Sequence, residues 1–232
     1  MVRLVPSAAL GGLAVVVPFV VFAMAAVLMP DATGQWTAKE GPVEHVSHGV
    51  LLLAVLAWSA RTVEVLRKPG GGDPHAQGTA NGVWLPLGVA LWMAVVLAEE
   101  LDWGAVYGFN GLAGQLSRVA GRPDLHNAWS GASYLVFCIP VLVLAGLGLV
   151  GTKQGAQPNG VALDRSDAAA LIVVMAVSFV GTLAWSAGEA QLDEVAELVL
   201  YGVLFWIAAR PRPREGLGRC DRQPAVRKEI SP

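Results

Sequence analysis

The sequence predicts an all-α integral membrane bundle of six transmembrane helices, with both termini in the cytoplasm. Hydrophobic residues make up 54% of the chain and charged residues only 15%, and the mean hydropathy is +0.54. This composition is typical of integral membrane proteins. Six apolar segments also have roughly the 20 residues that a bilayer core of about 30 Å requires.

The six predicted spans cover most of the chain before residue 210. In chain order they occupy residues 8–29, 43–61, 83–101, 127–150, 167–187 and 191–209. The first could instead be a cleaved signal peptide, but its apolar run exceeds the usual core of about 7 to 15 residues, which favours a retained helix. We therefore expect a transmembrane domain over 1–209 and a basic tail over 210–232, whose proline-rich, aperiodic sequence predicts disorder.

Lysine and arginine orient the bundle. Thirteen of the sixteen basic residues fall on one side, which the positive-inside rule assigns to the cytoplasm. They are Arg3, Arg61, Arg67, Lys68, Lys153, Arg165 and the seven from Arg210 to Lys228. We expect a bacterial inner-membrane protein whose partners are membrane lipids and not nucleic acids. Cys138 falls mid-span and Cys220 in the tail, so no structural disulfide is expected.

Acidic residues and histidines gather on the opposite, outer side. Eleven of the eighteen acids and three of the four histidines lie there. Only sixteen residues run from Val83 to Ala98, and only twelve separate His48 from Arg61. The adjoining polar groups must therefore lie at or below the outer membrane boundary. Ionisable groups at the bilayer centre cost about 2.5–3.5 kcal/mol each and usually face the bundle interior.

Helical spacing predicts that these groups converge in one outer pocket. Glutamates and histidines spaced three and four residues apart share helix faces, as bundle-core metal ligands do. The candidate metal ligands are Glu44, His45, His48, His126, Glu194 and Glu197. For Glu44 and Glu194 a second interpretation stays open, because carboxylates in a first helical turn also stabilise the helix dipole.

Glu99, Glu100 and Asp102 are the candidate catalytic residues. They end the third predicted span, where a helix C-terminus disfavours negative charge, so capping does not explain them. Glu99 and Glu100 project about 100° apart around the helix. We expect Glu100 to enter the pocket and Glu99 to lean toward the membrane interface or a neighbouring helix.

Four segments together resemble a loose group of uncharacterised bacterial multi-pass membrane proteins. The segments are "KEGPVEHVSHGVLLLAVLAW", "LAEELDWGAVYGF", "DLHNAWSG" and "DEVAELVLYGVLF". The matching positions are Glu40, Gly41, Glu44, Glu99, Glu100, Trp103, Gly104, Leu125, His126, Asn127, Asp193, Glu194, Glu197 and Leu198. Lys39, Ala105 and Asp124 depart from the pattern. The resemblance implies one polar site and no particular activity.

A weaker similarity is to alkaline-ceramidase-type membrane hydrolases, which use a serine, an aspartate and three histidines around zinc. Ser47, Asp102 and the three outer histidines offer the same residue types in a different order and spacing.

Three functions follow as hypotheses. In a zinc-dependent hydrolase of a lipid-like amide or ester, His45, His48 and His126 would hold zinc, and Glu100 or Asp102 would be the general base. The first alternative is a non-enzymatic cation- or proton-binding transporter or membrane assembly subunit. The second is a carboxylate-bridged di-metal redox protein.

Overall fold

The computed structural model describes residues 7–38, 41–67, 78–108, 110–120, 132–151, 163–185 and 192–210. Within these ranges every secondary-structure element is a helix. The all-α prediction is therefore confirmed for the described residues, whereas the tail from residue 211 onward lies outside them.

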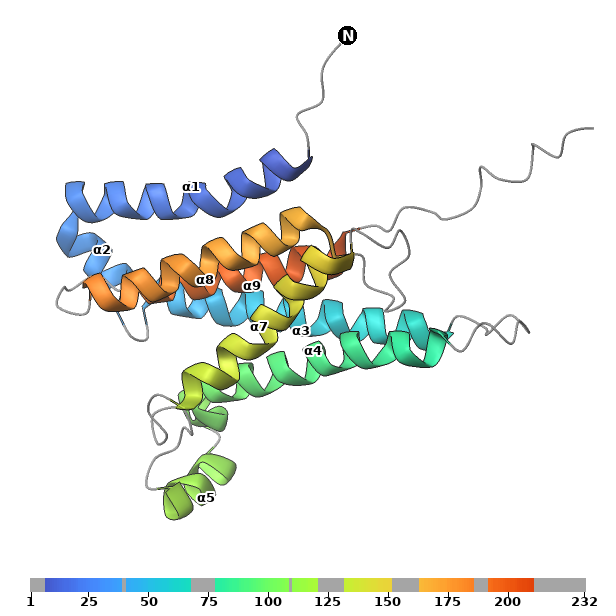
Figure 1. The fold of residues 1–232 in the computed structure, drawn as a ribbon. Coiled ribbons are helices and arrows are strands. Elements are labelled where there is room, and N and C mark those ends of the chain that lie inside the picture. The colour runs from blue at the N-terminus through green and yellow to red at the C-terminus, as the bar shows by residue number, and fades with distance from the viewer. Residues whose placement is uncertain are drawn as a thin grey trace, which may run out of the picture.

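Six long helices form the body of the protein. They are α1 (Ser7–Leu28), α3 (Pro42–Arg67), α4 (Gly78–Glu100), α7 (Ala132–Gly151), α8 (Arg165–Trp185) and α9 (Leu192–Ala209). They correspond to the six predicted segments, and successive long helices run in opposite directions (Figure 1). By length and composition, two stretches of the described chain can cross a membrane, Pro42–Arg67 and Gly82–Glu100. This agrees with the predicted membrane association.

Three short elements were not predicted. They are the helix α2 (Pro30–Thr37), the 3₁₀ helix η2 (Asp102–Tyr107) and the helix α5 (Asn110–Ala120). In α2 the hydroxyls of Thr33 and Thr37 donate to carbonyls four residues earlier, at 2.8 and 2.9 Å. Both threonines are buried, so α2 satisfies its own polar groups where it packs against α3 and α9.

The main core lies where α3, α4, α7, α8 and α9 meet. Leu51 and Trp58 of α3, Met93 of α4 and Leu204 of α9 are fully buried in it. The indole N–H of Trp58 donates to the carbonyl oxygen of Leu204 at 3.1 Å. This bond satisfies the polar atom of the largest core side chain and fixes α3 against α9.

The outward surface of the bundle is apolar. Soluble monomers rarely expose large contiguous apolar patches, so this surface suits contact with lipid tails. The exposed residues include Val20, Val21 and Met24 on α1, Leu52 and Leu56 on α3, Leu91 and Val95 on α4, Leu142 and Val143 on α7, Ile172 and Phe179 on α8, and Trp206 on α9.

Two arginines tie the helices together at the end of the bundle where α3 ends, which we call the arginine end. Arg61 donates through Nε to the carbonyl of Ala208 at 2.6 Å and through Nη2 to the carbonyl of Arg210. Its charge thereby complements the C-terminal dipole of α9. Arg210 in turn forms ion pairs with Asp164 and Asp167 at the start of α8.

Asp164 is the N-cap of α8. Its Oδ1 accepts from the backbone N–H groups of Ser166 and Asp167, while Asp167 Oδ2 accepts from the Asp164 N–H, which is a capping box. Burial alone would raise the pKa of Asp164. The hydrogen bonds from Ser166 and Asp167 and the charge of Arg210 outweigh burial and hold that pKa below its usual value. The stabilisation is therefore present at neutral pH and lost on acidification through the folded-state pKa.

The turn between α2 and α3 requires a glycine. A Cβ at Gly41 would lie 2.6 Å from the carbonyl oxygen of Ala38 and 2.8 Å from that of Trp36. The contacts are backbone atoms, which cannot move aside as a flexible side chain could. This explains the glycine of the "KEGPVE" segment in terms of packing.

We expect Gly41→Ala to destabilise the protein by about 1–3 kcal/mol, the usual cost of overpacking. Gly49→Ala is the matched control, because a Cβ at Gly49 meets no atom within 4 Å. Thermal unfolding in detergent micelles measures both. Equal midpoints for the two variants would contradict the tight turn.

Candidate functional site

The predicted site residues collect at the other end of the bundle, which we call the carboxylate end. There α3 begins with Glu44, His45 and His48, and α4 ends with Glu99 and Glu100 (Figure 1). Asp102 follows in η2. Helix α9 begins at this end as well and carries Glu194 and Glu197, and α3 packs against both α4 and α9. His126 lies outside the described residues.

The first turns of α3 hold a buried acid–histidine pair. Glu44 and His48 are both buried, and His48 Nε2 lies 3.8 Å from Glu44 Oε1. Neither ring nitrogen of His48 makes a hydrogen bond within the described part of the chain. Ser47 is also buried, but its hydroxyl donates to the Glu44 carbonyl at 2.7 Å, so this hydroxyl has its hydrogen-bond partner within α3. Buried polar atoms are normally paired, and His48 is therefore the unusual group here.

His45 and His48 face different surroundings. Their ring centroids are 6.2 Å apart with the planes at 71°, yet His45 is exposed and His48 is buried. Among the described residues, no three or more histidine, cysteine, aspartate or glutamate side chains are grouped to hold a metal ion. The three-histidine zinc site also requires His126, and it stays a prediction.

Glu99 is covered by the chain reversal that follows it. Asp102 and Trp103 have φ angles of 46° and 52°, a left-handed conformation that is unusual for tryptophan. The reversal brings the Trp103 indole back over α4, where Nε1 donates to Glu99 Oε1 at 2.6 Å. Glu99 is only 4% exposed. The Glu99 carboxylate is therefore paired with the Trp103 indole, and which of the two glutamates enters the predicted pocket stays a prediction.

Glu100 reaches the acids of α9. The hydroxyl of the buried Tyr201 donates to the Glu100 carboxylate, and Glu197 and Glu194 lie close enough to act on Tyr201 electrostatically. On α9 these three residues are spaced by three and four positions, so they share one face. Glu100, Glu194 and Glu197 are thus brought together around one phenol, which we call the Tyr201 cluster. Tyr201 was not among the predicted site residues, because a buried tyrosine on an apolar helix gives no signal of its contact with α4.

The register of α3 against α9 relates the Tyr201 cluster to His48. Trp58 bonds to Leu204, 146 positions later, and Arg61 bonds to Ala208, 147 positions later. The two helices are therefore parallel with a nearly constant offset. The same offset puts His48 level with Glu194, to within about one helical turn of 5.4 Å. Both groups lie at the carboxylate end.

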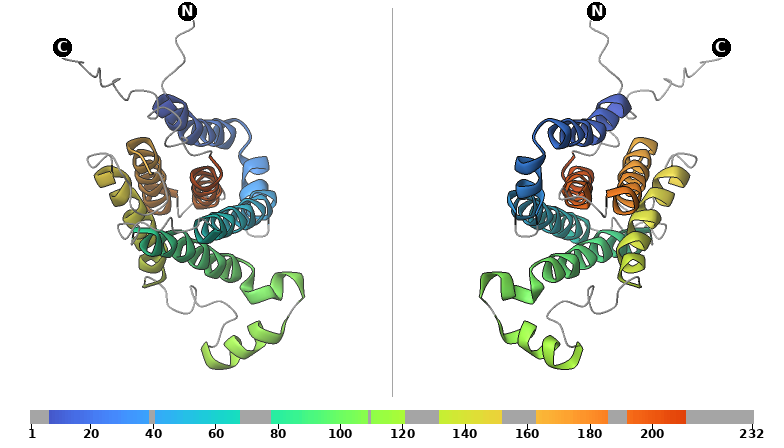
Figure 2. Two further views of the ribbon diagram at one scale, coloured as in Figure 1. Left: turned by 90° about the vertical axis from the view of Figure 1, so that its right-hand side faces the viewer. Right: turned by 90° about the vertical axis from the view of Figure 1, so that its left-hand side faces the viewer.

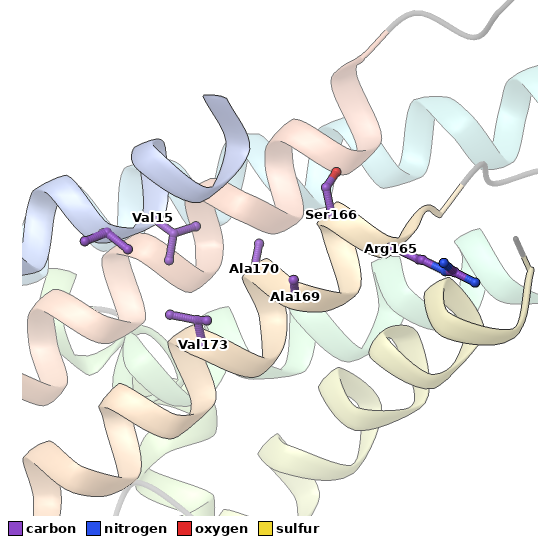
Figure 3. A pocket seen from close by; sticks show the side chains of 7 residues that line it. Val15, Arg165, Ser166, Ala169, Ala170 and Val173 are labelled. Atoms are coloured by element: carbon purple, nitrogen blue, oxygen red, sulfur yellow. The ribbon is translucent and has the colours of Figure 1, made fainter. Parts of the chain in front are cut away.

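A separate groove lies at the arginine end. It has a volume of about 250 Å³ and is lined by Val15 and Val16 of α1 and by Arg165, Ser166, Ala169, Ala170 and Val173 of α8 (Figure 3). None of the predicted site residues is among them. The groove is therefore not the predicted polar pocket.

Comparison of the chain with protein-family models, curated proteins and solved structures found no match. The resemblance to uncharacterised bacterial multi-pass proteins stays a prediction. Function must therefore be inferred from the residues themselves.

We expect Trp103→Phe to destabilise the protein by about 1.5–3 kcal/mol, because a buried carboxylate loses a charge-assisted hydrogen bond. Trp84→Phe is the control for loss of an indole, since Trp84 is 69% exposed. The free energy of unfolding, measured by denaturant titration in micelles, compares the two. A loss no larger than that of the control would mean that the Glu99 contact contributes nothing.

Proposed function

We propose that the chain is a non-enzymatic, multi-pass inner-membrane protein that binds a proton in an acid–histidine site at its outer end. The proposed topology has six spans and both termini in the cytoplasm. It is supported by the alternating directions of the six long helices (Figure 1), by their exposed apolar residues and by the excess of basic residues on one side. The carboxylate end then faces outward.

The observation that carries the proposal is the Tyr201 cluster. Three carboxylates act on one buried hydroxyl, and Glu100 is hydrogen-bonded to it. Mutual repulsion among neighbouring carboxylates is relieved when one of them takes up a proton. Tyr201 supplies a donor that holds the remaining charge in place. Intramembrane acids in such settings serve proton relays and substrate pathways.

A proton fits the site better than a metal ion. Three carboxylates act on the Tyr201 hydroxyl and one is hydrogen-bonded to it, whereas the described side chains form no group of three that could hold a metal ion. A proton needs only two heavy atoms at hydrogen-bonding distance, whereas a structural or catalytic metal needs three or four ligands at about 2 Å. His48, buried beside Glu44, is a second group that can accept a proton.

A zinc-dependent hydrolase acting on a lipid-like amide or ester is the second candidate. The specific observation in its favour is the proximity of the His45 and His48 rings. His126 would complete the zinc ligands, and Glu100 or Asp102 would act as the base. Metal analysis of the purified protein separates the candidates: one zinc per chain favours the hydrolase, and two irons favour the di-metal redox protein.

The topology gives the first prediction from this proposal. Reporter fusions after Gly72 and after Gly155 should read as cytoplasmic, and a fusion after Gly121 as extracytoplasmic, because these positions lie in successive connections between the proposed spans. Alkaline phosphatase and green fluorescent protein activities report the two sides. The reverse pattern would place the carboxylate end in the cytoplasm and contradict the proposal.

The second prediction from this proposal concerns proton binding. Between mildly alkaline and mildly acidic pH, the infrared difference spectrum should show a protonated carboxyl band that is lost or strongly reduced in Glu100→Gln and Glu197→Gln. Glu64→Gln is the control, because Glu64 is exposed and paired with Arg61 at 3.0 Å. Removing a carboxylate from the cluster relieves the repulsion that favours the proton. An equal band in all three variants would contradict a proton held by the Tyr201 cluster.

A further inference from the structure

Helix α5 lies outside the bundle and across its axis. In Figure 2 α8 and α9 are seen nearly end-on and the other long helices obliquely, whereas α5 is seen lengthwise, beyond α4 on the side away from α1, α8 and α9. In Figure 1 it lies at the level where α4 ends. Its main contact among the described elements is with η2. If α4 spans the membrane, α5 therefore runs parallel to the membrane plane at the outer boundary.

The sequence of α5 is amphipathic, and one edge of its apolar stripe is left exposed by the rest of the described chain. Leu112, Ala113, Leu116 and Val119 follow the three-and-four spacing of one helix face, and Gln115, Ser117 and Arg118 lie outside that stripe. Ala113 at one edge of the stripe is buried. At the other edge Leu112 is 47% exposed and Val119 is 89% exposed.

We propose that α5 is an interfacial helix whose apolar stripe inserts into the outer leaflet. The neighbouring helix α4, which η2 joins to α5, exposes the apolar side chains Leu91 and Val95, and in the proposed topology these face lipid. An amphipathic helix at that level buries its apolar face about 5–10 Å into the boundary between headgroups and acyl chains. A second protein copy fits less well, because three aliphatic side chains are far fewer than the roughly 20–30 residues per side of a stable interface.

With α5 at the membrane surface, the outer leaflet is connected to the candidate site through η2. Helix α5 packs on η2, the element that begins with Asp102 and Trp103. Trp103 in turn holds Glu99. An α5 anchored in the leaflet thus fixes the strained reversal that covers Glu99. The interfacial placement of α5 rests on the proposed membrane topology. Labels on α5 and on α4 distinguish a failure of this placement from a failure of the topology.

The test uses nitroxide labels on single cysteines in lipid nanodiscs, after Cys138 and Cys220 are replaced by serine. Val119→Cys and Leu112→Cys probe the apolar stripe, and Ser117→Cys and Gln115→Cys probe the polar face. Leu91→Cys on α4 is the reference for a lipid-facing position. Accessibility to oxygen, which partitions into lipid, is compared with accessibility to a water-soluble nickel chelate.

We expect the labels at 112, 119 and 91 to favour oxygen, and those at 115 and 117 to favour the nickel chelate. Labels at 119 and 117 that are equally accessible to the chelate, with 91 still favouring oxygen, would overturn the interfacial helix alone. A label at 91 that favours the chelate would overturn the membrane topology and the interfacial helix with it.

Discussion

The parallel pairing of α3 with α9 is the constraint on which the rest of the structure depends. The two helices are 125 or more residues apart in the sequence, from Arg67 to Leu192, and two side chains of α3 fix their register. Trp58 bonds to the backbone of α9 in the core, and Arg61 bonds to its C-terminal carbonyls. Once this register is set, the acids that begin α9 lie at the same end of the bundle as the acid–histidine pair that begins α3.

Charged side chains have different surroundings at the two ends of the bundle. At the arginine end Arg61 meets the C-terminus of α9, and Arg210 meets the carboxylates that cap α8. At the carboxylate end, by contrast, three carboxylates act on the buried Tyr201 hydroxyl, and the ring nitrogens of His48 make no hydrogen bond within the described residues. Unpaired or like-charged burial is costly, so a protein keeps it where function requires it. The carboxylate end is therefore where we place function.

The strained reversal at Asp102 and Trp103 belongs to the same end. Left-handed conformations in residues other than glycine cost on the order of 1–3 kcal/mol and persist only where surrounding structure determines them. The strained conformation at Asp102 and Trp103 lets the Trp103 indole donate a hydrogen bond to the buried Glu99 carboxylate. The adjacent glutamates therefore have different surroundings, since Trp103 holds Glu99 while Tyr201 holds Glu100.

Hydrophobic length predicted the positions of the six long helices, because each apolar run of roughly 20 residues coincides with one long helix. Their ends were less predictable. Helix α3 continues to Arg67 and α4 starts at Gly78, since polar residues extend a helix without any hydropathy signal. Spacing also predicted that Glu100 would face the acids of α9. It could not predict the Trp103 reversal, the α5 helix or the tight turn at Gly41, because these depend on backbone angles and tertiary contacts.

The hydrogen bond between Glu100 and Tyr201 joins α4 to the acids of α9. A double-mutant cycle of Glu100→Gln and Tyr201→Phe, read as free energies of unfolding in micelles, measures that link. We expect a coupling energy between about 0.5 and 3 kcal/mol, the range for residues in one hydrogen-bond network. Single-variant effects that add to within about 0.3–0.5 kcal/mol would show that the two side chains act independently, which would contradict that link.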